Sequence, residues 1–345
     1  MKRPPWPRLQ AECRRHSMEL LTFNHSGYPR IGDNSDEQVL RRAIAQHDRG
    51  ENTDSEVRAA EDHLALLALE DQQNAGIDIV TDGQIRWNDP VSHLAGRLQG
   101  LHINGLLRFV DTNFYFRQPV VQGRIDWLQP LIVEEFKWAA KRAGQPVKAI
   151  VTGPYTLARL SIRENGSASK DDLIVAYAEA LAAEVAELAS AGAKLIQVDE
   201  PALLRHPADM ALVREAVSLV ASRKGEAELA LATYFGDAVP VYAELQALPV
   251  DTLVLDFTYS PKLPQIIESE GSTKQFAFGV LDGRNTRLED QQATARLVER
   301  MLARIKSGRN YVTSSCSLEY LPRDRARLKL RQLTALKKSL LGEAP

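Results

Sequence analysis

The chain has 345 residues, of which 44% are hydrophobic and 26% are charged, and its formal net charge is −2. This composition is typical of a globular protein with a large core, and the balanced charge gives no reason to expect nucleic acid or an anionic membrane as a partner. Two cysteines do not make a disulfide framework. The sequence has no apolar run of about 18 residues and no secretory signal, so we expect a cytoplasmic protein that does not enter a membrane.

Eight short, apolar, β-forming runs are spaced along the chain and alternate with stretches of helical periodicity. These runs are residues 20–24, 77–83, 147–153, 195–200, 229–235, 252–257, 275–283 and 311–316. The clearest helical stretches are 171–192, 287–308 and 323–341, the last with a basic face expected to be solvated. Eight strands that each lead into a helix predict an α/β fold, a single (β/α)8 TIM barrel.

The barrel is predicted to be one domain over residues 19–345, preceded by an N-terminal arm over residues 1–18. Residues 100–130 fit neither the helical nor the strand period. We therefore expect them to form an excursion after the second strand, built as a hairpin over the barrel mouth.

Active sites of this fold lie at the C-terminal ends of the strands, so the residues just past each strand form one ring. One stretch of the ring, IQVDEPAL (196–203), leads a buried strand into two carboxylates, which costs free energy unless a partner neutralises them. Because adjacent strand residues face opposite sides, we expect Asp199 to face a ligand and Glu200 to point into the structure. The alternative is an ion pair with Arg30, Arg86 or Arg284 that closes the mouth.

Other ring residues each allow two readings. His25 is either a ligand-binding or a structural histidine, and Cys316 is either functional or an inert buried thiol. Arg30 can bind an anionic substrate group or pair with the ring aspartates. Tyr234 can fill the barrel or offer a flat surface to a ligand.

Five motifs in order, GYPRIG, GIDIVTDGQ, VTGPYT, IQVDEPAL and SSCSL, resemble the cobalamin-independent methionine synthases, from about residue 20 to the end. The full-length enzymes of that family have two barrels, and the C-terminal one binds zinc and homocysteine. The resemblance implies that Asp199 holds the ammonium group of an amino-acid substrate. It also implies that the backbone at Ser26 and Gly27 receives the substrate carboxylate, and that Cys316 is a zinc ligand.

The chain departs from the family at several of these places. Ala232 and Tyr234 stand where the catalytic barrel has His-x-Cys, and Asp256 stands where it has a glutamate ligand. Gln84 replaces a second carboxylate for the substrate amine, and a family histidine is replaced near Arg284. The zinc ligand set is therefore incomplete, because zinc needs three protein ligands besides an open position.

The remaining metal ligands are Cys316, Asp256 and His25. Oxygen-rich sets with a histidine also suit iron or manganese, so another divalent metal stays open. No nucleotide cofactor is expected.

The resemblance implies a methyltransferase that acts on a thiol such as homocysteine, with Asp199, Cys316 and Arg284 as catalytic residues. Substrate-binding residues would be Ser26, Gly27, Arg30, Gln84, Asp199, Tyr234 and Asn285. The folate-associated barrel is absent from this chain, which favours a methyl-corrinoid on a partner protein as the donor. Two alternatives stay open: a divergent enzyme for another small anionic substrate with a non-zinc metal, and a non-catalytic accessory subunit.

Overall fold

The computed structural model describes residues 19–110, 112–164 and 169–343. Seven parallel strands form one sheet in the order β1-β10-β9-β8-β7-β6-β4. Their bounds are β1 (Glu19–Thr22), β4 (Ala149–Thr152), β6 (Leu195–Asp199), β7 (Glu228–Thr233), β8 (Thr252–Asp256), β9 (Gln275–Leu281) and β10 (Arg309–Ser314). The predicted α/β barrel is confirmed, while the arm predicted over residues 1–18 lies outside the described residues.

The second predicted strand is reduced to two isolated parallel bridges, Phe23 with Ile79 and Val80 with Val147, which place it between β1 and β4. Side chains replace part of its ladder. The Asp78 carboxylate accepts a hydrogen bond from the backbone N–H of Thr22 at 2.7 Å. The carboxylate thus satisfies a backbone N–H of β1 that a neighbouring strand would otherwise satisfy. The segment therefore lies between β1 and β4 without a regular hydrogen-bond ladder.

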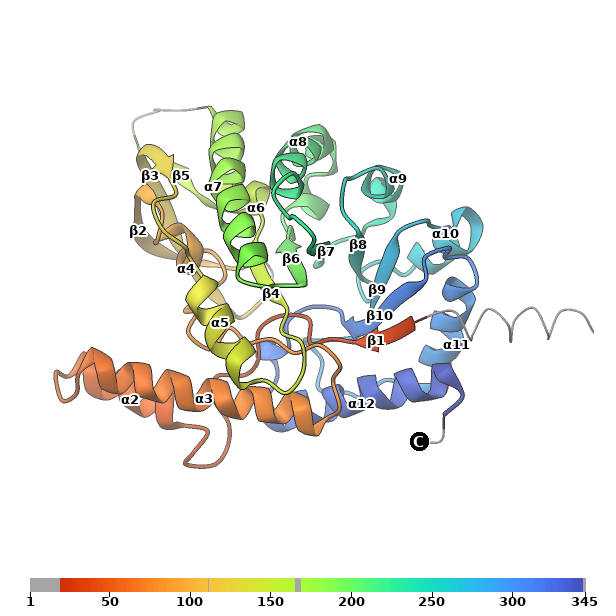
Figure 1. Ribbon diagram of the computed structural model, residues 1–345, viewed down its shortest axis with the longest axis horizontal. Coiled ribbons are helices and arrows are strands. Elements are labelled where there is room, and N and C mark those ends of the chain that lie inside the picture. Colours follow the sequence, from red (N-terminus) through yellow and green to blue (C-terminus); the bar gives the residue numbers. More distant parts are fainter. Residues whose placement is uncertain (1–18, 111, 165–168, 344–345) are drawn as a thin grey trace, which may run out of the picture.

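Helices lie outside the strands, and Figure 1 shows α7 to α12 arranged around them. Their bounds are α2 (Val39–Asp48), α3 (Asp54–Asn74), α4 (Ser92–Ala95), α5 (Val133–Arg142), α6 (Pro154–Leu160), α7 (Lys170–Ser190), α8 (Met210–Ala221), α9 (Tyr242–Gln246), α10 (Leu263–Glu270), α11 (Gln291–Leu302) and α12 (Arg323–Leu341). Short 3₁₀ turns are Leu203–Arg205, Pro207–Asp209, Val239–Val241 and Leu318–Tyr320. No helix in the described part of the chain is long and apolar enough to cross a bilayer.

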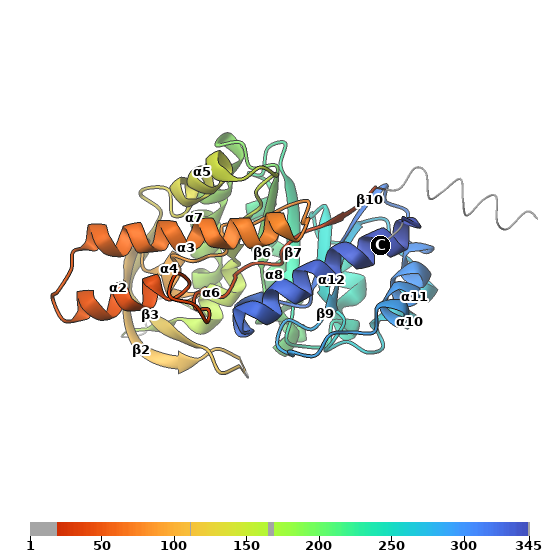
Figure 2. The same cartoon turned by 90° about the horizontal axis from the view of Figure 1, so that it is seen from below.

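The helix predictions differ from the structure in two respects. Helix α11 begins at Gln291 and not near residue 287, because the Asp290 side chain accepts a hydrogen bond from the Ala293 N–H and caps it. The solvated basic face predicted for α12 is wrong for Lys329, which is 0% exposed, and Arg323 at the start of the helix is also buried, at 1%. Acidic partners face them, and α3 and α12 lie side by side in Figure 2.

Each of these two buried cations has a partner in a neighbouring element. Arg323 Nε donates to Asp71 of α3 at 2.8 Å, and Lys329 Nζ donates to Glu289 at 2.6 Å. A buried charge is tolerated only when paired and hydrogen-bonded, and periodicity along one helix does not reveal such a partner.

The excursion after the second strand is a hairpin of β2 (Gln99–Arg108) and β3 (Tyr115–Asp126), extended by the short strand β5 (Ile162–Arg163). Aromatic contacts join its turn to the barrel mouth. Phe109 lies 6.4 Å from Phe235 and Phe114 lies 4.7 Å from Tyr320, measured between ring centroids. Since Phe235 and Tyr320 follow β7 and β10, the predicted hairpin over the mouth is confirmed.

Glu184 of α7 anchors the segment that leads into α5. It is fully buried and accepts hydrogen bonds from the backbone N–H groups of Leu131 and Ile132 at 2.6 and 2.8 Å, and from Trp127 Nε1 at 2.9 Å.

We expect Glu184→Gln to lower the free energy of unfolding by about 1 kcal/mol, because an amide N–H would then face buried donors. Urea denaturation would measure this, with exposed Glu187→Gln as the control; equal midpoints would contradict it.

Candidate active site

Asp199, the last residue of β6, lies at the barrel mouth and is 5% exposed. Its Oδ1 accepts a hydrogen bond from Gln197 Nε2 at 2.7 Å, and its Oδ2 accepts one from the Tyr234 hydroxyl at 3.2 Å. Burial raises the pKa of Asp199 to about 6. Among the described residues this carboxylate has no salt bridge, and Arg86 pairs with Asp62. Asp199 therefore keeps lone pairs for a further donor.

Glu200 points away from the mouth, as the strand alternation predicts. Its carboxylate accepts hydrogen bonds from the N–H groups of Tyr155 and Thr156 at 2.9 and 2.8 Å, and from the Thr156 hydroxyl at 2.6 Å. Tyr155 and Thr156 are in the first turn of helix α6, so the carboxylate satisfies N–H groups that have no partner within the helix. Burial nevertheless raises the pKa of Glu200 to about 7.

Lys148 lies below Asp199 inside the barrel and is 2% exposed. Its Nζ donates to Gln197 Oε1 at 2.5 Å and to the His25 carbonyl at 2.9 Å, and lies 3.5 Å from the centroid of the Phe23 ring. Burial lowers the pKa of Lys148 well below its usual value, and the charges of Asp199 and Glu228 oppose this shift. Because Lys148 Nζ donates to the Gln197 oxygen, the amide nitrogen faces Asp199. Lys148 therefore determines that the Gln197 amide nitrogen, and not its oxygen, faces Asp199 and donates a hydrogen bond to it.

The segment after β1 brings His25, Ser26 and Gly27 next to Tyr234. His25 Nδ1 lies 3.0 Å from Ser26 Oγ, and the His25 ring meets the Tyr234 ring edge-on at 5.2 Å. Burial, with the nearby Lys148 charge, lowers the pKa of His25 well below its usual value, so the imidazole is neutral. Within the described residues, the N–H groups of Ser26 and Gly27 have no acceptor. Two backbone donors therefore remain for an anionic group.

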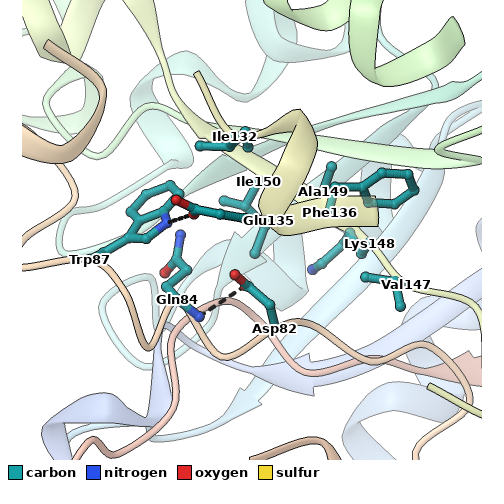
Figure 3. A pocket seen from close by; sticks show the side chains of 10 residues that line it. All are labelled: Asp82, Gln84, Trp87, Ile132, Glu135, Phe136, Val147, Lys148, Ala149 and Ile150. Carbon is teal, nitrogen blue, oxygen red and sulfur yellow. Dashed lines mark hydrogen bonds between the residues drawn. The ribbon is translucent and has the colours of Figure 1, made fainter. Parts of the chain in front are cut away.

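Gln84 follows the second predicted strand, and its side-chain oxygen lies near Gly27. Its backbone is in the left-handed region, with φ of 50°. Its N–H donates to Asp82 Oδ1 at 2.9 Å, as Figure 3 shows. Asp82, Gln84, Glu135 and Lys148 line a cavity of about 20 Å³, enough for about one water molecule. Burial raises the pKa of Asp82 to about 6. The cavity is too small for a substrate.

Arg284, after β9, is held by the aromatic side of the mouth. Its guanidinium lies 5.0 Å from the Phe235 ring centroid and 4.7 Å from that of Tyr259, and it donates to the Tyr259 hydroxyl. Asn285, predicted beside it as a substrate-binding residue, is exposed and accepts a hydrogen bond from the Arg287 N–H at 3.0 Å. The structure therefore does not bring Asn285 to Asp199.

Asp256 acts as a cap of the loops after β7 and β8. It accepts hydrogen bonds from the N–H groups of Phe235 and Thr258 at 3.2 and 2.8 Å, and from the Thr258 hydroxyl at 2.6 Å. Phe235 has φ of 63°, which is uncommon for a bulky residue, so the cap stabilises an unfavourable turn. Both Asp256 oxygens are thus committed to the protein.

Zinc does not fit the residues present. Cys316 is buried, and its Sγ lies 3.7 Å from the Ser317 carbonyl oxygen; burial raises the pKa of this thiol well above its usual value. In the described ranges no three His, Cys, Asp or Glu side chains are placed to hold one ion, so His25, Asp256 and Cys316 do not form a ligand set. A thiolate ligand needs positive charge around it, which a metal with enough donors provides.

Residues 29–338 match the family described as the catalytic domain of cobalamin-independent synthases. The chain belongs to the cobalamin-independent methionine synthase family. The resemblance carried by the five motifs is confirmed, and so is the expected enzyme class, a methyltransferase related to the methionine synthases.

Relatives in this family match nearly the whole chain. The methionine synthase of Sulfurisphaera tokodaii is 32% identical over 305 residues, which cover 87% of this chain and 88% of that protein. The methionine synthase of Saccharolobus solfataricus is 29% identical, with coverage of 87% and 90%. A B12-independent methionine synthase from Shewanella sp. W3-18-1, solved with selenomethionine, has a TM-score of 0.77 at 21% identity and covers 93% of this chain and 98% of its own. That likeness shows the shared barrel fold.

Lys148 and Gln197 next to Asp199, and Glu319 after β10, were not predicted from the sequence. A signal for the first two was present, because each is a polar residue inside an otherwise apolar strand, VKAIVTG and LIQVDE. Such a residue must find a buried partner. Glu319 follows the SSCSL motif on a short 3₁₀ turn, where sequence alone does not indicate its direction.

The incomplete donor set predicts that the protein, purified without chelators, carries less than about 0.1 zinc per chain. The physical reason is that both Asp256 oxygens already accept hydrogen bonds from the protein, and that no three His, Cys, Asp or Glu side chains among the described residues are placed to hold one ion. Elemental mass spectrometry measures this directly. Stoichiometric zinc that is lost in a Cys316→Ser variant would contradict the prediction.

Proposed function

We propose that the protein transfers a methyl group to the sulfur of homocysteine and so forms methionine. The observation that carries this proposal is the pairing of a buried carboxylate, Asp199, with the backbone N–H groups of Ser26 and Gly27, which have no acceptor among the described residues. An amino-acid zwitterion offers the matching charges, because its ammonium donates to a carboxylate and its carboxylate accepts from N–H groups. Membership of the methionine synthase family supports the same substrate class.

The reaction needs a thiolate, which attacks the donor methyl group in line. An S–CH3 bond forms, the bond between the methyl carbon and the donor breaks with its electron pair staying on the donor, and the thiol proton passes to solvent before the attack. Without the family's zinc set, a cation of the protein must favour the thiolate, and we assign this role to Arg284. Its guanidinium lies over the rings of Phe235 and Tyr259 at the mouth, where a positive charge would favour the thiolate of a bound substrate.

The methyl donor is the least constrained part of the proposal. A methyl-corrinoid carried by a partner protein stays a prediction, as does the cytoplasmic location. At the mouth, the exposed ring of Phe114 packs edge-on against Tyr320 and provides an aromatic surface for a large planar donor.

The test incubates purified protein with L-homocysteine and a deuterated methyl donor, either methylcobalamin or 5-methyltetrahydrofolate, and detects labelled methionine by mass spectrometry. We expect labelled methionine with one of the two donors, and none when homocysteine is omitted. Protein that binds L-methionine but forms none with either donor would contradict the methyl transfer and favour the accessory-subunit alternative. Protein that neither binds nor reacts would favour another small anionic substrate.

A further inference from the structure

Glu319 lies beside Gly27, whose N–H, like that of Ser26, has no acceptor in the part of the chain that the structure describes. A Cβ at residue 27 would lie 2.9 Å from Ser317 Oγ, 3.1 Å from Gln84 Oε1 and 3.3 Å from the carboxyl carbon of Glu319. The Ser317 hydroxyl holds this arrangement, since it donates to the Gly27 carbonyl at 3.1 Å and accepts from the Glu319 N–H at 3.2 Å. A carboxylate and an amide oxygen therefore converge on the substrate-facing backbone of residue 27.

The charges around Glu319 leave it without a close cation. Among the described residues it forms no salt bridge, and Arg30, the nearest opposing charge, lies beyond ion-pair distance although the two attract each other. Arg30 Nε is itself buried without a hydrogen-bond partner. Burial raises the pKa of Glu319 to about 7, and repulsion from Asp89 and Asp199 adds to this. Two buried carboxylates near one mouth are costly unless a ligand brings positive charge.

We propose that Glu319 is a second acceptor for the substrate's ammonium group, which it holds together with Asp199. This inference rests on the proposed amino-acid substrate and deepens it. Asp199 contacts the segment 25–27 through Tyr234 and His25, Glu319 contacts it through Ser317, and the two carboxylates are close enough to repel each other. The Ser26 and Gly27 N–H groups and Arg30 then face the substrate carboxylate.

The geometry also explains how Gln84 can stand where the resembling family has a second carboxylate. The amide oxygen of Gln84 accepts a hydrogen bond but carries no charge, whereas Glu319, next to it around Gly27, supplies the charge from another strand end. A structural role is the competing explanation, in which Glu319 only supports the Ser317 turn.

The experiment compares two ligands by isothermal titration calorimetry near pH 8. One is L-methionine, and the other is 4-(methylthio)butanoate, which has the same chain and carboxylate but no ammonium. We expect Glu319→Gln to weaken L-methionine binding by at least about tenfold and binding of the analogue by less than about twofold. The matched control is Glu61→Gln, which removes another carboxylate that attracts Arg30 and should change neither affinity by more than about twofold.

The outcomes separate the explanations. Equal weakening of both ligands by Glu319→Gln would assign the residue a structural role and overturn the inference. Unchanged L-methionine binding would overturn it as well, while leaving the proposed function intact. Wild-type protein that binds neither ligand would refute the proposed substrate class, and the ammonium site with it.

Discussion

Replacing Asp199 by asparagine is expected to lower kcat/KM for methionine formation by at least about 100-fold, which corresponds to about 3 kcal/mol of lost charge-assisted binding. The amide keeps the shape of the side chain. Its oxygen still accepts from Gln197 Nε2, and its nitrogen can face the Tyr234 hydroxyl. What disappears is the negative charge that neutralises the substrate ammonium. The measurement is steady-state kinetics, with thermal unfolding to establish that the fold is kept.

Asp237→Asn is the matched control for this experiment. Asp237 is also at the C-terminal end of a barrel strand, but it is exposed and its Oδ1 accepts a hydrogen bond from the Val239 N–H at 3.0 Å. We expect its kcat/KM to stay within about threefold of the wild type. A loss of less than about fivefold in Asp199→Asn would show that this carboxylate does not bind the ammonium group.

Replacing Lys148 by methionine is expected to lower activity about threefold near pH 6.5 and much less near pH 8.5. The pKa of Asp199 is about 6, and the Lys148 charge lowers it against the effect of burial. Without that charge the pKa rises. Because the ionised carboxylate binds the substrate and is lost as the pH falls through this pKa, activity disappears at a higher pH than in the wild type. Gln197 also loses the partner that orients its amide.

The measurement is kcat/KM between about pH 5.5 and 8.5, with Lys148→Arg as the variant that retains the charge. We expect the acidic limb of the profile to move upward by about one pH unit in Lys148→Met and to return toward the wild-type position in Lys148→Arg. A loss that is the same at every pH would instead indicate that Lys148 only fills the barrel interior. The two variants therefore separate the charge of Lys148 from its volume.

The buried carboxylates carry a cost in stability. The pKa values of Asp199, Glu200, Asp256 and Glu319 are all raised by burial. A carboxyl group with a raised pKa in the folded state stabilises that state less as the pH rises above the unfolded value. Glu200 and Asp256 compensate by accepting N–H groups, whereas Asp199 and Glu319 lie toward the proposed ligand. Such costs are characteristic of residues kept for binding.

The barrel was largely predictable from the sequence. Apolar runs, helical periodicity and five motifs at strand ends were enough to predict eight strand positions, the hairpin over residues 100–130 and the family. The direction of Asp199 and Glu200 also followed from sequence, because side chains alternate along a strand and the rule needs no knowledge of neighbours. Composition and periodicity depend only on residues that are near one another in the chain, so both can be read from the sequence without the structure.

Partners across the barrel were decided by the tertiary structure. Asp256 lies at a strand end like Asp199, yet it caps the turn at Phe235, and Asn285 faces solvent while Glu319 reaches Gly27. The buried cations Lys148 and Lys329 find acceptors more than 30 residues away in the chain. The pairing of each buried carboxylate or carbonyl oxygen with its donor depends on the strand register and on the course of the loops. The sequence by itself therefore determined the scaffold and the carboxylate of Asp199, and only the folded barrel decided which charges meet there.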